Sequence, residues 1–259
     1  MEVLVLPTPA DVARRAAEVV IDGLAAARRT APVIGLATGS SPLGLYAELA
    51  KAVRSGRLDL SGATGFALDE YVGLPAGHPQ SYRAVLLREV CEPLGLTSER
   101  LHVPDGSGPE EDELVSGATE YERLIRDAGG VDVQILGIGA NGHLGFNEPG
   151  SALSSRTRVK RLSDRTRHDN ARFFTGIDDV PTHCVTQGLG TVLDARRLVL
   201  VASGPAKAEA VAAALEGPLS ASCPASVLQW HADATAVLDE AAASRLRNRQ
   251  YYDASAAGL

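Results

Sequence analysis

The feature that most constrains the fold of this chain is a regular alternation of short, continuously apolar segments with longer helix-like segments. The apolar segments lie at residues 2–6, 32–37, 65–68, 131–139, 196–202 and 234–239. The helix-like segments lie at residues 9–29, 81–93, 110–127 and 206–216, and a further one begins near residue 43. Strands that are apolar at every position are covered on both faces, and strands that alternate with helices pair in parallel. The pattern predicts an α/β fold: a doubly wound, mostly parallel sheet with helices on both faces, in a modified Rossmann-like arrangement.

The chain carries no sign of a division into separate units. Thr8 and Pro9 occupy the positions of an N-cap and a first helical residue, which places the first helix directly after the first strand. No internal repeat and no long linker interrupts the pattern, and residues after 239 form a polar, Arg-rich tail. We therefore predict a single domain over residues 1–259.

Composition and charge exclude several classes of partner. The net charge of −7 provides no global field for nucleic acid or an anionic membrane, so an anionic ligand needs a local pocket. The three cysteines, Cys91, Cys184 and Cys223, are far apart and form no CxxC pair, which favours a reducing compartment. The opening MEVLVLP looks like a strand rather than a signal peptide, and no apolar run is long enough to span a membrane. These features predict a cytoplasmic protein with no nucleic-acid or membrane partner.

Several predicted strands end in residues suited to holding a phosphate. TGSSP (38–42) is a small-residue turn before a helix, so Thr38, Gly39, Ser40 and Ser41 can cradle an anion with backbone N–H groups and hydroxyls, although an ordinary capped turn has the same pattern. Lys207 follows SGPA at another strand end, where a solvated lysine is the alternative. Arg172, beside two phenylalanines expected in the core, reads as structural on its own. TGSSP lacks the GK[ST] of a nucleotide-binding loop.

Two other strand ends carry acid–base candidates. Asp69 and Glu70 follow the third strand, where a carboxylate can move a proton between adjacent sugar carbons, although a loop acid is more often solvated. GIGANGHLGFNEPG (137–150) places His143 and Glu148 five residues apart, so a carboxylate can tune an imidazole.

The same glycine-rich segment contains GxGxxG, which elsewhere marks a dinucleotide site. That site requires a helix at the third glycine, and Gly145, Pro149 and Gly150 oppose one. The six histidines lack metal-ligand spacing and no GxSxG occurs, so neither a metal site nor a serine nucleophile is expected.

Together these segments resemble the glucosamine-6-phosphate deaminase family over nearly the whole chain. The matching segments, in the family's order, are TGSSP, LDEYVGL (68–74) with HPQSY (78–82), GIGANGHLGFNEPGS (137–151), SRTRVK (155–160) and SGPAK (203–207). The resemblance implies conversion of glucosamine 6-phosphate and water to fructose 6-phosphate and ammonium, without a metal or organic cofactor.

The resemblance also implies roles for individual residues. Asp69 would move the proton from C2 to C1, and His143 would shuttle the proton that opens the ring. Glu148 would orient and charge-tune His143, with Asn141 in the same group, a position where family members have Asp or Asn. The residues implied in binding the substrate phosphate are Thr38, Gly39, Ser40, Ser41, Arg172 and Lys207.

Regulation and assembly stay open at this point. Some family members are hexamers activated by N-acetylglucosamine 6-phosphate, and Ser151, Arg158 and Lys160 match that allosteric site. Arg156, Arg158 and Lys160 alternate as one face of a strand would, so a solvated basic edge strand explains them equally well. Ala152 stands where a regulated member has Ser, and the tail also departs from the pattern.

Three other functions compete with this reading. A 6-phosphogluconolactonase shares the broad fold and a GHxx loop, but FNEP and the DEYVGL acid argue against it. A non-catalytic sugar-phosphate sensor would usually carry a DNA-binding helix-turn-helix, and no basic segment outside the core supplies one. A dinucleotide enzyme would bind nicotinamide.

Overall fold

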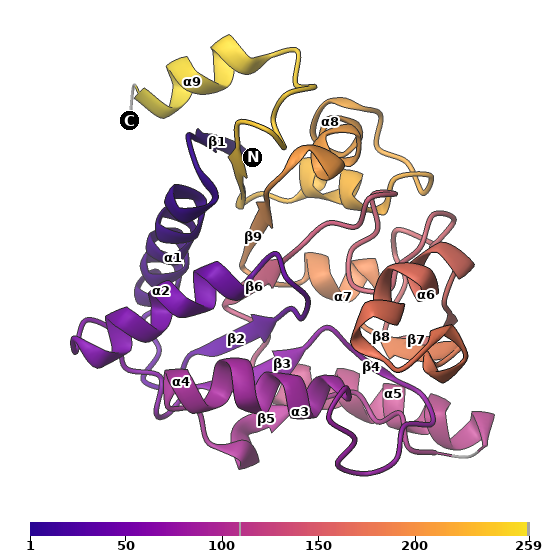
Figure 1. Cartoon of the computed structure of the whole chain (residues 1–259). Coiled ribbons are helices and arrows are strands. Elements are labelled where there is room, and N and C mark those ends of the chain that lie inside the picture. The colour runs from indigo at the N-terminus through magenta and orange to yellow at the C-terminus, as the bar shows by residue number, and fades with distance from the viewer. Residues whose placement is uncertain (109, 258–259) are drawn as a thin grey trace.

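A computed structural model describes residues 1–108 and 110–257, so residues 109, 258 and 259 of the predicted domain lie outside the described part. The strands of the central sheet are β1 (Glu2–Leu6), β2 (Val33–Leu36), β3 (Thr64–Ala67), β5 (Leu101–His102), β6 (Val133–Leu136), β9 (Arg197–Ala202) and β10 (Ala234–Asp239). They form one sheet in the order β1-β10-β9-β6-β2-β3-β5, and every neighbouring pair is parallel (Figure 1). All six predicted strands belong to it, which confirms the predicted fold class; β5 is an addition.

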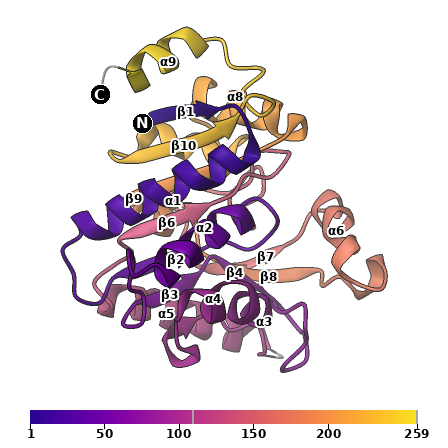
Figure 2. The same ribbon diagram turned by 60° about the vertical axis from the view of Figure 1, so that its left-hand side comes forward.

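Helices cover both faces of this sheet. The helices are α1 (Pro9–Ala26), α2 (Leu43–Arg54), α3 (Tyr82–Leu86), α4 (Glu92–Leu94), α5 (Glu111–Asp127), α6 (Asp164–Asn170), α7 (Leu189–Leu193), α8 (Ala208–Glu216) and α9 (Arg249–Ala257). A π-helical turn, η1 (Leu87–Cys91), joins α3 to α4, and the 3-10 turns are η2 (Ser98–Arg100), η3 (Ala171–Phe173), η4 (Ile177–Asp179), η5 (Pro205–Lys207) and η6 (Pro224–Trp230). Right-handed crossovers put α1 and α2 on one face, as Figure 2 shows, and α5, α7 and α8 on the other.

Local signals explain where these elements begin and how they pack. The Thr8 hydroxyl accepts a hydrogen bond from the Asp11 N–H at 3.2 Å and so caps α1 as predicted. In the middle of the sheet, β2 and β6 are buried at every position. Each fully buried Leu or Ile there contributes about 1.5–3 kcal/mol to folding. The apolar runs of the sequence are therefore the centre of the core.

A second, smaller sheet lies beside the first and was not predicted. Its strands are β4 (Asp69–Tyr71), β7 (Arg158–Arg161) and β8 (His183–Thr186), antiparallel in the order β4-β8-β7. Asp69 and Glu70 were expected in a loop; that expectation is wrong, because β4 continues the chain of β3 into this sheet, where Asp69 pairs with Thr186. The basic segment with Arg158 and Lys160 is the edge strand β7.

The strand order defines where a ligand binds. β2 leads through α2 to β3 on one side of the sheet, whereas β6, its neighbour, leads to β9 on the other side. The chain therefore changes direction between β2 and β6, and ligands of such sheets bind outside the carboxyl ends at this switch point. TGSSP follows β2, and the glycine-rich segment from Gly137 follows β6.

The polar, Arg-rich tail after β10 contains one more helix. Residues 249–257 form α9, which packs near β1 (Figure 1). The Glu216 carboxylate at the end of α8 accepts hydrogen bonds from the N–H groups of Arg247 and Asn248, both at 2.8 Å, and so fixes the approach to α9. In the described part of the chain, no helix combines the length and apolar character needed to cross a membrane.

Candidate active site

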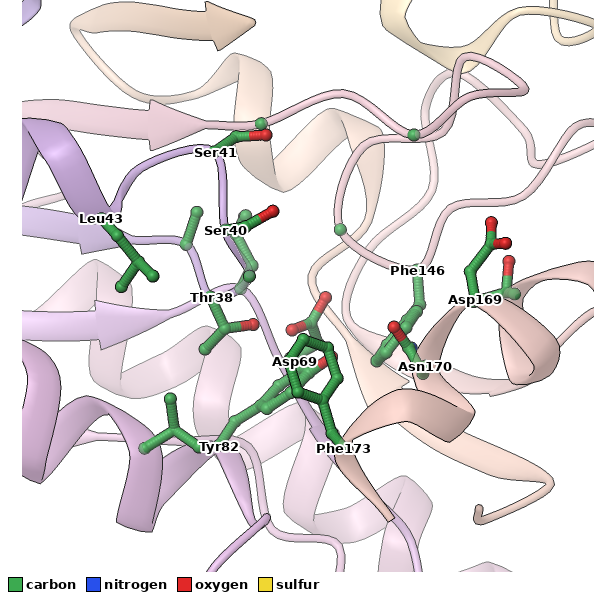
Figure 3. Close-up of a pocket in the computed structure, with 18 of the residues that line it drawn as sticks. Thr38, Ser40, Ser41, Leu43, Asp69, Tyr82, Phe146, Asp169, Asn170 and Phe173 are labelled. Carbon is green, nitrogen blue, oxygen red and sulfur yellow. The ribbon is translucent and has the colours of Figure 1, made fainter. Parts of the chain in front are cut away.

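A cavity of about 600 Å³ opens at the switch point between β2 and β6. Figure 3 shows Thr38, Ser40 and Ser41 on one side of it and Asp169 and Asn170 on the other, with Asp69 between them. The predicted site residues that line it are Thr38, Gly39, Ser40, Ser41, Asp69, His143, Arg172 and Lys207. Asn141 and Glu148 stand behind His143 and do not line it. Ser151, Arg158 and Lys160 also lie outside its lining.

One end of the cavity gathers groups suited to an anion. The Tyr46 hydroxyl accepts from the Ala37 N–H at 3.0 Å and donates to the Ala37 carbonyl at 2.9 Å, which fixes the backbone entering TGSSP. The Lys207 ammonium reaches across from the β9–α8 connection and donates to the Ile138 carbonyl at 2.7 Å. Burial lowers the pKa of Lys207; the Asp169 charge raises it, and those of Arg172 and Arg165 lower it. This end is therefore rich in positive charge and backbone donors.

Arg172 lies on the outer wall of the cavity, on η3. Its guanidinium stands 4.7 Å above the centre of the Phe173 ring. The expectation that both neighbouring phenylalanines are core residues is wrong for Phe173, whose side chain is 43% exposed at the cavity wall. Phe174 is half-buried and packs against Tyr71 of the small sheet.

Asp69 is the acid at the centre of the cavity. It is buried, and its pKa is raised to about 8, first by loss of water and then by the Glu70 charge. Glu70 has a different use, since its carboxylate accepts from the N–H groups of Tyr82 at 2.8 Å and Arg83 at 2.9 Å at the start of α3. Of the two adjacent acids, Asp69 faces the cavity and Glu70 holds a helix.

The glycines of GIGANGHLGFNEPG allow close approach rather than dinucleotide binding. A Cβ on Gly139 would come within 2.2 Å of the His143 ring, and one on Gly145, whose φ is +54°, within 3.0 Å of the Asp69 carboxylate. Residues 142–150 contain no helix, so the requirement of a dinucleotide site is not met. The segment wraps around His143 and passes beside Asp69.

Asn147 fixes this loop to the small sheet. Its side chain is fully buried, and its amide donates to the carbonyls of Leu144 at 3.0 Å and Gln187 at 2.8 Å. The Thr186 hydroxyl accepts from the Phe146 N–H at 3.2 Å. β8 thus holds the FNEP segment beside Asp69.

His143 lines the cavity and forms one group with Asn141 and Glu148, which lie behind it. The side-chain amide of Asn141 donates to Glu148 Oε2 at 2.7 Å, and the Asn141 side-chain oxygen Oδ1 accepts from the backbone N–H of His143 at 3.2 Å. Glu148 Oε2 lies 3.9 Å from His143 Nδ1, which is close enough for charge interaction but too long for a hydrogen bond. Burial lowers the pKa of His143, and the Glu148 charge opposes part of that effect. The imidazole is thereby neutral near pH 7 and able to accept a proton.

Sequence reasoning missed the helix that forms the outer wall. Arg165, Thr166, Asp169 and Asn170 of α6 line the cavity, and the Asn170 amide donates to the Tyr71 hydroxyl at 3.0 Å. Ser163 caps α6 by accepting from the Thr166 N–H at 3.2 Å. A serine followed by Asp164 is a helix-start signal that could have located α6, although not its contact with the cavity.

The residues described by the structure offer no metal centre. Among positions 1–108 and 110–257, no group of three or more His, Cys, Asp or Glu side chains is arranged to hold a metal ion. The groups that face the cavity are suited instead to binding an anion and moving protons.

A cavity at the switch point of an α/β sheet, lined by groups suited to an anion and by a carboxyl and an imidazole, is the arrangement that the class of sugar-phosphate isomerases and hydrolases requires. The chain belongs to the family of glucosamine-6-phosphate isomerases and 6-phosphogluconolactonases, whose model matches residues 7–237. Within the family, it is 54% identical over 252 residues to a glucosamine-6-phosphate deaminase of Rhodococcus jostii, covering 97% of this chain and 95% of the relative. It is 58% identical over 226 residues to that of Bifidobacterium longum subsp. infantis, covering 85% and 84%.

Solved structures agree with this assignment. A monomeric glucosamine-6-phosphate deaminase superposes with a TM-score of 0.89 at 38% identity, over 95% of this chain and all of the other. The 6-phosphogluconolactonase of Trypanosoma brucei superposes with a TM-score of 0.73 at 19% identity, over 95% and 98% of the two chains. The second likeness is one of fold.

Proposed function

We propose that this chain is a glucosamine-6-phosphate deaminase, which converts glucosamine 6-phosphate and water to fructose 6-phosphate and ammonium. The observation that carries the proposal is that Asp69 and His143 line one cavity together with the anion-binding loop. A lactone hydrolysis requires no base for a carbon-bound proton, whereas an aldose–ketose isomerisation does. Identity above 50% to deaminases over most of the chain points the same way.

The substrate phosphate binds at Thr38, Gly39, Ser40 and Ser41, with Lys207 and Arg172 supplying positive charge. This anchor fixes the sugar so that its reacting carbons lie near Asp69, and the binding energy of the remote phosphate thereby serves the reaction. The partner of the protein is an amino-sugar phosphate.

Ring opening is the first chemical step. His143 takes the proton of the C1 hydroxyl and delivers it to the ring oxygen, and the C1–O5 bond breaks to give the aldehyde. A group that both accepts and donates one proton works best with a pKa near the working pH. Glu148, 3.9 Å from the imidazole, stabilises the transient imidazolium through its charge. Asn141 orients that carboxylate.

Isomerisation and release of ammonia follow. Asp69 takes the C2 proton, which the adjacent aldehyde has acidified, while the ammonium group gives a proton to the C1 oxygen, so that an enol amine forms. Asp69 then returns its proton at C1, and the nitrogen lone pair forms the protonated imine at C2. Water adds to the imine carbon, the C–N bond breaks, and ammonia leaves with a proton. Burial favours neutral Asp69 in the free protein, and the positive amine of the substrate favours its ionised form, so substrate binding prepares the base.

Ammonium release from glucosamine 6-phosphate, compared with hydrolysis of 6-phosphogluconolactone, tests the proposal. The parent protein should release ammonium and leave the lactone unchanged, and Asp69→Asn should lose roughly 10²-fold or more in kcat. Lactone hydrolysis without ammonium release would refute the deaminase.

We propose further that Ser151, Arg158 and Lys160 form an effector site for a second sugar phosphate. The Ser151 hydroxyl is buried without a hydrogen-bond partner among the described residues, and Arg158 is half-buried on the edge strand β7. Activity with and without N-acetylglucosamine 6-phosphate tests the site. Sedimentation distinguishes a hexamer, as in some relatives, from a monomer.

We also propose that residues 1–259 act as one catalytic domain in the cytoplasm. The family model matches residues 7–237 of it. The three cysteines, Cys91, Cys184 and Cys223, are all free thiols, in keeping with a reducing compartment. Fractionation of the native host tests the location.

A further inference from the structure

Glu148 is held by two hydroxyl groups that the proposed mechanism does not yet use. Its Oε1 accepts a hydrogen bond from Ser163 Oγ at 2.9 Å and another from Thr166 Oγ1. Its Oε2 accepts from the Asn141 amide at 2.7 Å. Both hydroxyls come from the first turn of α6, far along the chain from the loop that carries Glu148. Three donors therefore converge on one carboxylate behind the catalytic imidazole.

These donors determine where the carboxylate points. With both oxygens engaged, Glu148 stays 3.9 Å from His143 Nδ1, and that nitrogen has no hydrogen-bond partner among the described residues. A carboxylate at this distance stabilises an imidazolium by charge without holding its proton, since Coulomb attraction extends beyond hydrogen-bond range. An imidazole that must accept and return one proton benefits from that arrangement.

We propose that Ser163 and Thr166 are positioning residues for ring opening, which act by keeping Glu148 ionised and at its distance from His143. This inference rests on the proposed function. Hydrogen bonds to a carboxylate favour its charged form. Although burial raises the pKa of Glu148, the bonds from Thr166, Asn141 and Ser163 and the nearby His143 hold it below its usual range.

Other charges act on the same pair, and two of them, Arg165 and Asp169, lie on α6 itself. Lys207, Arg165 and Asp169 act on His143, and the Cys184 thiol lies near Glu148 with its pKa raised by burial and so stays neutral. None of these is removed by changing the two hydroxyls.

The position of α6 is also fixed by hydrogen bonds that do not involve Ser163 or Thr166. The Arg167 guanidinium donates to the carbonyls of Ile177 at 2.9 Å and Val180 at 3.0 Å, and Asn170 donates to Tyr71. Loss of the two hydroxyls should therefore affect Glu148 more than the position of the cavity wall.

The test uses Ser163→Ala, Thr166→Val and the double variant, with Thr166→Ser as the conservative replacement. Steady-state ammonium release from glucosamine 6-phosphate gives kcat and KM over roughly pH 4 to 9, a range that includes the titration of Glu148. Calorimetric binding of 2-amino-2-deoxyglucitol 6-phosphate, an analogue that cannot close a ring, reports the cavity without ring opening. Thr8→Ala is the matched control, because Thr8 caps α1 in the same manner away from the cavity.

We expect the double variant to lose about tenfold or more in kcat and its acid limb to move upward by about one pH unit, because Glu148 loses donors to its charged form. Binding of the linear analogue should change by less than about threefold. Thr166→Ser and Thr8→Ala should keep the parent kcat and pH profile.

Two outcomes would overturn the inference: an unchanged pH profile in the double variant, or a loss of kcat matched by an equal loss of analogue binding. If the double variant does not fold, as judged by its melting curve, the two single variants decide by the same criteria. A parent protein that releases no ammonium would instead refute the proposed function.

Discussion

Asp69, the proposed base, lowers the stability of the folded protein above its unfolded-state pKa. In the unfolded chain its carboxyl ionises near its ordinary pKa of 3.8, whereas in the folded protein it stays protonated up to about 8. The folded state therefore binds more protons between these two values, and stability falls as the pH rises through that window. Burying this carboxyl therefore lowers the free energy of unfolding at neutral pH.

We expect Asp69→Asn to stabilise the protein while it abolishes most activity. The gain in unfolding free energy should be smallest near pH 3, where the Asp69 carboxyl is protonated in both the folded and the unfolded chain, and should grow by about 5 kcal/mol toward pH 8. Urea unfolding of the parent and the variant at both pH values measures it. A gain that does not grow with pH would contradict the raised pKa.

Glu148 and Asn141 should differ in their response to substitution. Glu148→Gln removes the negative charge beside His143 and should lower kcat by about 10²-fold. Asn141→Asp places two carboxylates within hydrogen-bond distance, which then share a proton and keep one charge, so kcat should fall by less than about tenfold with a shifted pH profile. Ammonium release across pH compares them. Equal activity of Glu148→Gln and the parent would exclude its role.

The loop that carries His143 depends on one buried amide. Asn147→Ala removes the side-chain donor to the carbonyls of Leu144 and Gln187, which keep only the residue 147 N–H and the Thr186 hydroxyl, and we expect a loss of roughly 1–3 kcal/mol in stability. Because the same bonds hold the loop against β8, kcat should fall as well. Thermal unfolding and steady-state kinetics measure both, with exposed Asn248→Ala as the control; a fully stable Asn147→Ala protein would show that the loop is fixed by other contacts.

At the scale of elements, the hydrophobic pattern of the sequence predicts the buried apolar strands and not the strands of mixed polarity. Six of the seven strands of the central sheet lie in largely apolar segments, so length and flanking turns locate them, whereas the two-residue strand β5 has no such pattern. The strands β4, β7 and β8 are short and mixed in polarity, and β4 joins the sheet only by pairing with β8, more than a hundred residues further along the chain. Glu70 looks like a second candidate base in the sequence, and its role at the start of α3 appears only in three dimensions.

At the scale of the molecule, the site is predictable where strand ends supply it and unpredictable where α6 closes it. Thr38, Asp69 and His143 follow or begin strands, and the parallel sheet brings such residues to one edge. Ser163 and Thr166 reach Glu148 only because the small sheet folds α6 back over that edge. No local pattern specifies this contact.

The balance between global and local charge also belongs to the whole molecule. The chain has a net charge of −7 but binds its proposed anionic substrate beside Lys207, Arg172 and Arg165. At about 0.1 M salt the Debye length is about 10 Å, so repulsion from the distant surface is already screened, and further salt weakens mainly the nearby attraction.

We expect KM for glucosamine 6-phosphate to rise about threefold between roughly 0.1 and 0.5 M sodium chloride, with kcat unchanged. Lys207→Met should raise KM at low salt and weaken its salt dependence, because one of the cations beside the substrate is lost. Initial rates at several salt concentrations measure both, and a KM that falls with added salt would mean that the surface charge, not the cavity, controls binding.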